Sequence, residues 1–317
     1  MGLLAAFGLG SLAGIILNIV GDRTRIARFQ RSQFMQLARY GLPLTLAGLS
    51  VAVYSACDRL IVAYLLGKDA AGIFGVAADL PRQFMVMIAS SVAAATVPLV
   101  FRSLSEKNAE TTRQRLTESL ELLLVVVAPV AVWLALAADQ VAGTLVGIDF
   151  RAGVSALLPT LVLARLFGIA NQFYVQISFQ LAERPFMLAA QSFLTLVVSV
   201  ILMFALIAGH GLYGAALATL ATEAIGLLVA VVLMHRAHPV PFELNRLAGV
   251  AASAAVMAAA ILVARSQAGG TGLVSLVVVS LAGGLAYAAA AWLLNVANVR
   301  TLSLRFLRTL NRKALGV

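Results

Sequence analysis

Residues 40–81 read YGLPLTLAGLSVAVYSACDRLIVAYLLGKDAAGIFGVAADLP, and this stretch decides the fold class. Its first half is an apolar segment long enough to cross a bilayer, which takes about 20 residues. Asp58 and Arg59 lie inside that segment, although a charged side chain within a membrane helix is costly. A loop of small residues, from Gly67 to Gly75, is predicted to lead into the next apolar segment. The stretch therefore indicates a membrane helix whose charges need a partner or a function.

The composition of the whole chain predicts the same class. Of its 317 residues, 62% are hydrophobic and 11% are charged, and the mean hydropathy is +0.98. An average soluble chain has about 25% charged residues. Long continuous apolar runs predict an all-α polytopic membrane helix bundle, since barrel strands are alternating segments of about ten residues. We expect nine transmembrane spans, at residues 3–20, 41–66, 81–101, 117–138, 155–181, 186–208, 212–234, 247–264 and 273–295.

The net charge of +10 is distributed unevenly over the connections between these spans. Seventeen basic residues fall in one set of alternate connections and in the C-terminal tail, and four fall in the other set. Cytoplasmic loops of membrane proteins carry the excess of Lys and Arg. The charge therefore predicts a multi-pass chain with a cytoplasmic C-terminus, and it does not indicate a nucleic-acid partner.

The residue types that support soluble-type enzyme chemistry are scarce. Cys57 is the one cysteine, and the three histidines do not cluster with carboxylates at metal-ligand spacing. The sequence contains neither a Gly-rich phosphate loop nor a nucleophile elbow. We therefore expect no metal, no cofactor and no enzymatic activity.

The charged pair of the second span allows two interpretations. Tyr54 and Asp58 share one helix face, and Ser55 and Arg59 share another. In the first interpretation, Arg59 reaches the outer interface and Asp58 neutralises a neighbouring group. In the second, one or both of the charges line a water-filled cavity.

The fifth span carries the strongest polar pattern. Arg165, Gln172 and Gln176 fall within about 40° of one another on an α-helix, and Gln180 lies slightly further round. Asn171 is predicted to point away from this stripe. Inter-helix hydrogen bonding is the simpler explanation of the glutamines. A central arginine costs at least about 2.5–3.5 kcal/mol on insertion scales, which favours a cavity-lining role for Arg165.

Glu223 lies near the middle of the seventh span, which is predicted to form a hairpin with the sixth around residues 209–211. A buried carboxylate needs a partner. One interpretation pairs Glu223 with Arg165 or Arg59, and the other makes it a coupling-ion or proton site. Asp58 has the same two possible roles.

Several segments together resemble a known family. They are YGLPL and DRLIVAYLLGKDAAGIFGVAADLP within residues 40–81, ATVPLV around Pro98, the entry of the fifth span at Pro159, and HGLYGAALATLATEAIG from His210. The first two look like the seventh and eighth helices of bacterial polysaccharide or O-antigen repeat-unit flippases. Those proteins belong to the multidrug/oligosaccharidyl-lipid/polysaccharide exporter superfamily.

The resemblance implies a domain organisation in which two six-helix lobes face a central cavity. Residues 1–20 would be the last helix of a first lobe whose first five helices are absent, and residues 21–39 a basic cytoplasmic linker between the lobes. Residues 40–235 would form the six-helix second lobe, and residues 246–295 two additional transmembrane helices. Residues 300–317 would form a basic amphipathic cytoplasmic tail. We expect either an incomplete chain or a first lobe supplied by another polypeptide.

The resemblance also implies a function. The chain would flip lipid-diphosphate-linked oligosaccharide across the bacterial inner membrane by alternating access, with polysaccharide polymerase and glycosyltransferase machinery and membrane lipids as its partners. Arg59 and Arg165 would attract the diphosphate, and Gln172 and Gln176 would complete the substrate site. Two alternatives stay open: a cation-coupled small-molecule exporter centred on Asp58 and Glu223, and a membrane interaction subunit that does not transport.

Overall fold

A computed structural model describes residues 10, 13–14, 31–106, 108–237, 240–241, 244–268, 270 and 272–298. Contacts divide the chain into two units, residues 1–42 and 43–317. The described part of the first unit consists chiefly of the opening turns of helix α2 (Arg31–Leu66). The second unit holds the rest of α2, all the described helices that follow it and all the predicted site residues.

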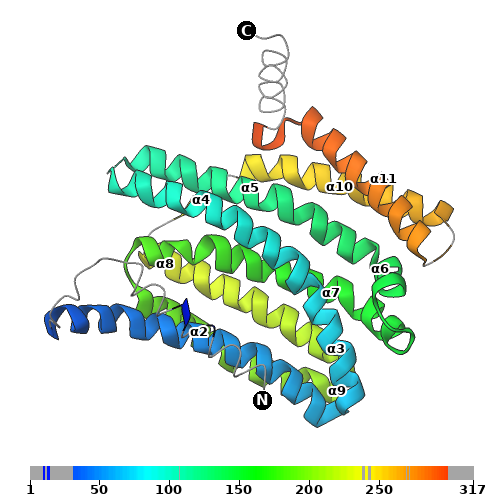
Figure 1. Ribbon diagram of the computed structural model, residues 1–317, viewed down its shortest axis with the longest axis horizontal. Coiled ribbons are helices and arrows are strands. Elements are labelled where there is room, and N and C mark those ends of the chain that lie inside the picture. Colours follow the sequence, from blue (N-terminus) through cyan, green and yellow to red (C-terminus); the bar gives the residue numbers. More distant parts are fainter. Residues whose placement is uncertain are drawn as a thin grey trace, which may run out of the picture. The chain divides into compact units, whose positions relative to one another are not determined.

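The second unit is a bundle of helices with two clusters of buried apolar residues in its interior. After α2 its elements are α3 (Lys68–Pro81), the π-helical turn η1 (Arg82–Val86), α4 (Met87–Ser105), α5 (Ala109–Leu136), α6 (Ala138–Leu145), the short turn η2 (Ile148–Phe150), α7 (Arg151–Ala170), the π-helical turn η3 (Asn171–Val175), α8 (Ile177–Leu181), α9 (Pro185–Ala237), α10 (Leu244–Ala268), α11 (Leu273–Leu293) and the short turn η4 (Val296–Asn298). Helix α5 packs against α4, α7 and α10, and it lies between α7 and α10 (Figure 1).

The membrane-helix prediction is confirmed for the described part of the chain. Seven helical segments there are long and apolar enough to cross a bilayer. All eight predicted spans between residues 41 and 295 coincide with helical segments, two of them within α9. The first predicted span, 3–20, and the predicted tail, 300–317, lie outside the described residues.

Helix α9 is two antiparallel arms joined at Gly211. A straight helix of its 53 residues would be about 80 Å long, far more than the roughly 30 Å hydrocarbon core of a bilayer. Gly211 has φ 56° and ψ −136°, a conformation outside the helical region. A hydrogen bond of 3.3 Å from Gln191 Nε2 to the carbonyl oxygen of Gly226 connects the two arms. This reversal is the hairpin expected from the sequence.

The prediction of a loop from Gly67 to Gly75 is wrong, because helix α3 occupies residues 68–81. Only Gly67 breaks the helix, with a φ of 92°. The small residues instead let α3 approach its neighbours closely, as they do in many membrane bundles. At Gly72, for example, an added Cβ atom would lie 3.0 Å from the Phe150 ring.

The predicted linker, 21–39, is described only from Arg31 onward. Residues 31–39 form the first turns of α2, and the helix continues without a break through Gly41 and Pro43. The boundary between the two contact units falls at Leu42 and Pro43, close to the predicted start of the second lobe. The assignment of residues 1–20, 21–39, 40–235 and 246–295 to lobes, linker and additional helices stays a prediction.

Polar contacts fasten α10 and α11 to the rest of the bundle. The Trp133 indole on α5 donates to Ser280 Oγ at 2.9 Å, and the Tyr287 hydroxyl donates to the Val125 carbonyl oxygen at 2.7 Å. Arg265 pairs with Asp139 at 2.5 Å. Since lipid supplies no partner for such groups, these contacts also satisfy polar atoms inside the bundle.

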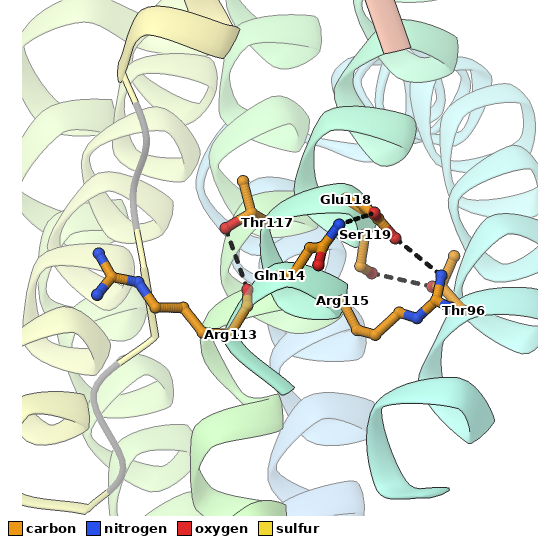
Figure 2. Close-up of polar contacts among 7 residues, drawn as sticks. All are labelled: Thr96, Arg113, Gln114, Arg115, Thr117, Glu118 and Ser119. Atoms are coloured by element: carbon orange, nitrogen blue, oxygen red, sulfur yellow. Dashed lines mark hydrogen bonds and ion pairs between the residues drawn. The ribbon is translucent and has the colours of Figure 1, made fainter. Parts of the chain in front are cut away.

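Helices α4 and α5 meet at a small polar cluster near the start of α5. Figure 2 shows Ser119 Oγ donating to Thr96 Oγ1 at 2.9 Å between the two helices. On the outer face of α5, Glu118 accepts from Arg115 at 2.9 Å and from Gln114 at 3.1 Å. The Ser119 contact joins α4 to α5, whereas the Glu118 contacts are local to α5, and none of these residues lines the cavities described below.

We predict that Gly211→Ala destabilises the chain by about 1–3 kcal/mol, because residues with a side chain rarely adopt this positive-φ conformation. Thermal unfolding of the purified protein in detergent measures the change. Gly209→Ala is the matched control, since that glycine is helical and an added Cβ atom there would meet nothing within 4 Å. Equal melting temperatures of the two variants would contradict the role given to Gly211.

Candidate functional site

A polar cavity of about 130 Å³ lies where α2, α7 with η3, and both arms of α9 converge. Its lining combines charged, amide and hydroxyl side chains, namely Ser50, Tyr54, Ser55, Arg165, Asn171, Gln172, Gln176, Gln191, Ser192, Thr195 and Glu223. A second cavity of about 40 Å³ adjoins it and shares Tyr54, Ser55 and Arg165. The structure therefore brings the predicted polar stripe of α7 to the charged residues of α2 and α9.

Arg165 and Glu223 face each other across this cavity. Arg165 Nη1 lies 3.7 Å from Glu223 Oε1, which makes an ion pair but is too long for a hydrogen bond. The Glu223 side chain is 9% exposed and that of Arg165 is 21% exposed. Tyr54 donates a long hydrogen bond of 3.4 Å to the same Glu223 oxygen. Of the two partners that the sequence allowed for Glu223, the structure selects Arg165.

Gly168 makes room for the Glu223 carboxylate. A Cβ atom added at Gly168 would lie 2.8 Å from Glu223 Oε2 and 3.0 Å from Cδ. Any side chain at this position would therefore displace the carboxylate. The glycine sets how closely α7 approaches the second arm of α9 at the ion pair.

Asp58 and Arg59 have separate partners. Asp58 is buried and accepts a hydrogen bond of 2.8 Å from Ser199 on the first arm of α9. Arg59 is 43% exposed and pairs with Asp79 on α3 at 2.5 Å. Asp79 also pairs with Arg82 at 3.0 Å. Asp58 and Arg59 both line the smaller cavity together with Arg165, so these three charges belong to one region.

Amide groups form another part of the lining of the main cavity. Gln176 Nε2 donates to Gln191 Oε1 at 3.1 Å. Gln191 Nε2 in turn donates to Thr195 Oγ1 and to the Gly226 carbonyl oxygen, both at 3.3 Å. Gln172 also lines the cavity, whereas Gln180 is exposed and does not.

Asn171 lines the cavity as well, so the expectation that it points away is wrong. The backbone N–H of Gln176 donates to the Asn171 carbonyl oxygen at 2.9 Å, a bond that spans five residues. In such a π-helical turn, residues five apart lie one above the other. Asn171 therefore stacks beside Gln176 on the cavity face, which a regular α-helix would not allow.

Three residues of this region, Gln191, Thr195 and Ser199, are not among the site residues predicted from the sequence. They lie in a span that is otherwise strongly apolar. Their spacing of four residues places them along one helix face, and this periodicity is the signal that could have found them. Within the described residues, no group of three or more His, Cys, Asp or Glu side chains could hold a metal ion.

Two comparisons with known proteins give a match for this chain. Residues 9–155 match a family model described as a polysaccharide biosynthesis protein. Among solved structures, the chain is similar to the lipid II flippase MurJ in an inward closed conformation, with a TM-score of 0.68 and 15% sequence identity. The match covers 90% of this chain and 60% of that chain. No curated protein matches the sequence.

The family match confirms the predicted resemblance to polysaccharide biosynthesis proteins, and the structural match confirms the predicted likeness to a flippase in fold. At 15% identity, the structural match establishes a shared fold, an all-α polytopic helix bundle. The chain spans about 60% of the length of that flippase. The function proposed below therefore rests on this fold and on the polar cavity.

We predict that Arg165→Gln destabilises the chain by about 1–3 kcal/mol, because it leaves Glu223 as a buried carboxylate without its cation. The expected loss of unfolding free energy is smaller than for a fully buried ion pair, because the Arg165 side chain is 21% exposed. The double variant Arg165→Gln, Glu223→Gln should recover at least half of the loss. Thermal unfolding of the single and double variants forms a double-mutant cycle. Additive losses would show that the two side chains are not coupled.

Proposed function

We propose that the chain is a membrane transporter that flips lipid-diphosphate-linked oligosaccharide units for polysaccharide biosynthesis. One observation carries the proposal: a partly exposed arginine inside a polar cavity in an otherwise apolar helix. Because Arg165 meets Glu223 at 3.7 Å, its guanidinium donors are not consumed by that carboxylate. Guanidinium groups match phosphate oxygens well. The family match and the flippase fold support a lipid-linked saccharide as the substrate.

Alternating access fits the polar residues of this region. The head group would enter from the inner leaflet with its diphosphate at Arg165 and its saccharide beside Gln172 and Gln176. Arg59 would take over the diphosphate in the adjoining cavity, where it lies with Arg165. Movement of the helices would then open the region to the outer leaflet. Flipping needs no covalent step, so we propose a transporter that is not an enzyme.

Asp58 and Glu223 would keep the cavity close to neutral between substrates. Glu223 offsets Arg165, and Ser199 holds Asp58 within the bundle. Release of Glu223 from Arg165 would accompany diphosphate binding, since both anions compete for one guanidinium. The two carboxylates would thus prevent a permanent positive charge from trapping the substrate.

A cation-coupled small-molecule exporter is a second candidate. The observation that favours it is the surplus of buried acid around the two cavities. Asp58 and Glu223 are both buried, whereas the three arginines that line the cavities, Arg59, Arg82 and Arg165, all have partly exposed side chains. In that function the two carboxylates would be the central groups.

We propose the bacterial inner membrane as the location, with the C-terminus in the cytoplasm. The asymmetric distribution of basic residues over the predicted connections supports this orientation. Membrane lipids and a lipid-linked oligosaccharide would be the direct partners. Polysaccharide polymerase and glycosyltransferase machinery would act before and after the flipping step.

We predict that Arg165→Gln lowers the flipping of a lipid-diphosphate-linked oligosaccharide at least about tenfold, because one charge-assisted contact to phosphate is lost. Flipping is measured in proteoliposomes as the exposure of labelled lipid-linked saccharide on the far leaflet. Arg102→Gln is the control, since Arg102 is an exposed residue of α4 that pairs with Glu106. Undiminished flipping by the Arg165 variant would contradict the proposal.

The exporter alternative makes a different prediction for Glu223→Gln. If the chain is a cation-coupled exporter of small molecules, this variant should abolish drug resistance in cells and leave the export of lipid-linked glycan unchanged. If the chain is a flippase, the variant should alter glycan export and leave drug resistance at the background level. Cells that carry the Glu223 variant, assayed for both properties, separate the two functions.

A further inference from the structure

The main cavity has two chemically distinct walls. Arg165 and Glu223 form a charged wall, and Asn171, Gln176 and Gln191 form an uncharged wall made of carboxamides. The flipping proposal uses the charged wall to attract a diphosphate. Attraction of a diphosphate requires positive charge, and the neutral amides of the carboxamide wall supply none. This wall therefore needs a different explanation.

Asn171 is the least satisfied member of the carboxamide wall. Its side chain lines the cavity and its residue is only 5% exposed. No residue that the structure describes donates a hydrogen bond to its Oδ1 atom. A buried polar atom without a partner is unfavourable, and in a native protein it calls for an explanation. A ligand that supplies a hydrogen-bond donor would provide the explanation.

Gln191 fixes the geometry of this wall. It is 2% exposed, and its amide group contacts Gln176, Thr195 and the backbone of Gly226. Gln191 is therefore a positioning residue, which joins the π-helical turn to both arms of α9. Asn171 and Gln176, stacked by that turn, are the residues that face a ligand.

Carboxamides suit the polar groups of a sugar. Each one offers an N–H donor and a carbonyl acceptor, which match hydroxyl and acetamido groups without a charge. The cavity of about 130 Å³ has room for roughly four water molecules at ~30 Å³ each, or for one polar edge of a sugar ring. The charged wall lies directly beside it, as a diphosphate lies beside the first sugar of a lipid-linked saccharide.

We propose that Asn171 and Gln176, held in place by Gln191, form an uncharged subsite that binds hydroxyl or acetamido groups of the first sugar. The inference rests on the proposed flippase function and assigns the two walls of one cavity to two parts of the substrate. Arg165 attracts the diphosphate, and the carboxamides distinguish the first sugar that is attached to it. A site built to hydrogen-bond such groups binds poorly to a ligand that lacks them.

The test compares two probes with the purified full chain in lipid nanodiscs: a polyprenyl diphosphate, and the same lipid carrying N-acetylglucosamine. Asn171→Leu, which keeps the approximate size and removes the amide, should weaken binding of the sugar-bearing lipid about tenfold. It should leave binding of the bare diphosphate lipid within about twofold. Gln176→Met should give the same pattern, which keeps the test decisive if Asn171→Leu does not fold.

Two control variants complete the design. Arg165→Gln should weaken both probes alike, because both carry the diphosphate. Gln180→Leu should change neither, since Gln180 lies on the same segment but outside the cavity. Equal weakening of both probes by the Asn171 and Gln176 variants, or no weakening, would overturn the sugar subsite alone. A wild-type chain that binds neither lipid would overturn the proposed function and the subsite with it.

Discussion

The ion pair between Arg165 and Glu223 is the interaction on which the arrangement of the bundle depends. Each charge alone would be expensive among apolar helices, and together they offset much of that cost. The pair joins α7 to the second arm of α9, and Tyr54 adds α2 to the same carboxylate. Gly168 is where α7 leaves room for the contact. Three helices therefore meet at one pair of charges, and the cavity forms around it.

Two departures from regular helix build the rest of the site. The reversal at Gly211 brings Gln191 and Glu223, 32 positions apart, to the same cavity. The π-helical turn at residues 171–175 adds Asn171 to the polar face of α7. Neither feature changes the apolar exterior that faces lipid. The polar interior is thus determined by backbone geometry at a few positions, while hydrophobic composition determines the fold class.

The helices could be predicted from the sequence, but the contacts between them could not. Apolar runs and Gly211 located the spans, and the cost of a central arginine identified Arg165 as a cavity residue. The partner of Glu223 could not be predicted from the sequence, because helical periodicity gives no information on the distances between helices. Asn171 was misplaced because a 100° rotation per residue does not hold through a π-helical turn. The sequence predicts a loop from Gly67 to Gly75, and the prediction fails because small residues permit both turns and close helix packing.

The π-helical turn also has a consequence for how such chains diverge. Its five-residue bond between Gln176 and Asn171 holds one residue more than an α-helical turn. Loss of a single residue there would restore a regular α-helical turn, and the residues that follow would keep their directions relative to the cavity, because the wide turn already accommodates the extra residue. The same deletion in the regular part of α7 would instead rotate everything that follows by about 100°. A one-residue gap at residues 171–175 in a related chain would therefore remove one side chain from the cavity wall and leave the inward-facing side chains of α8 in place.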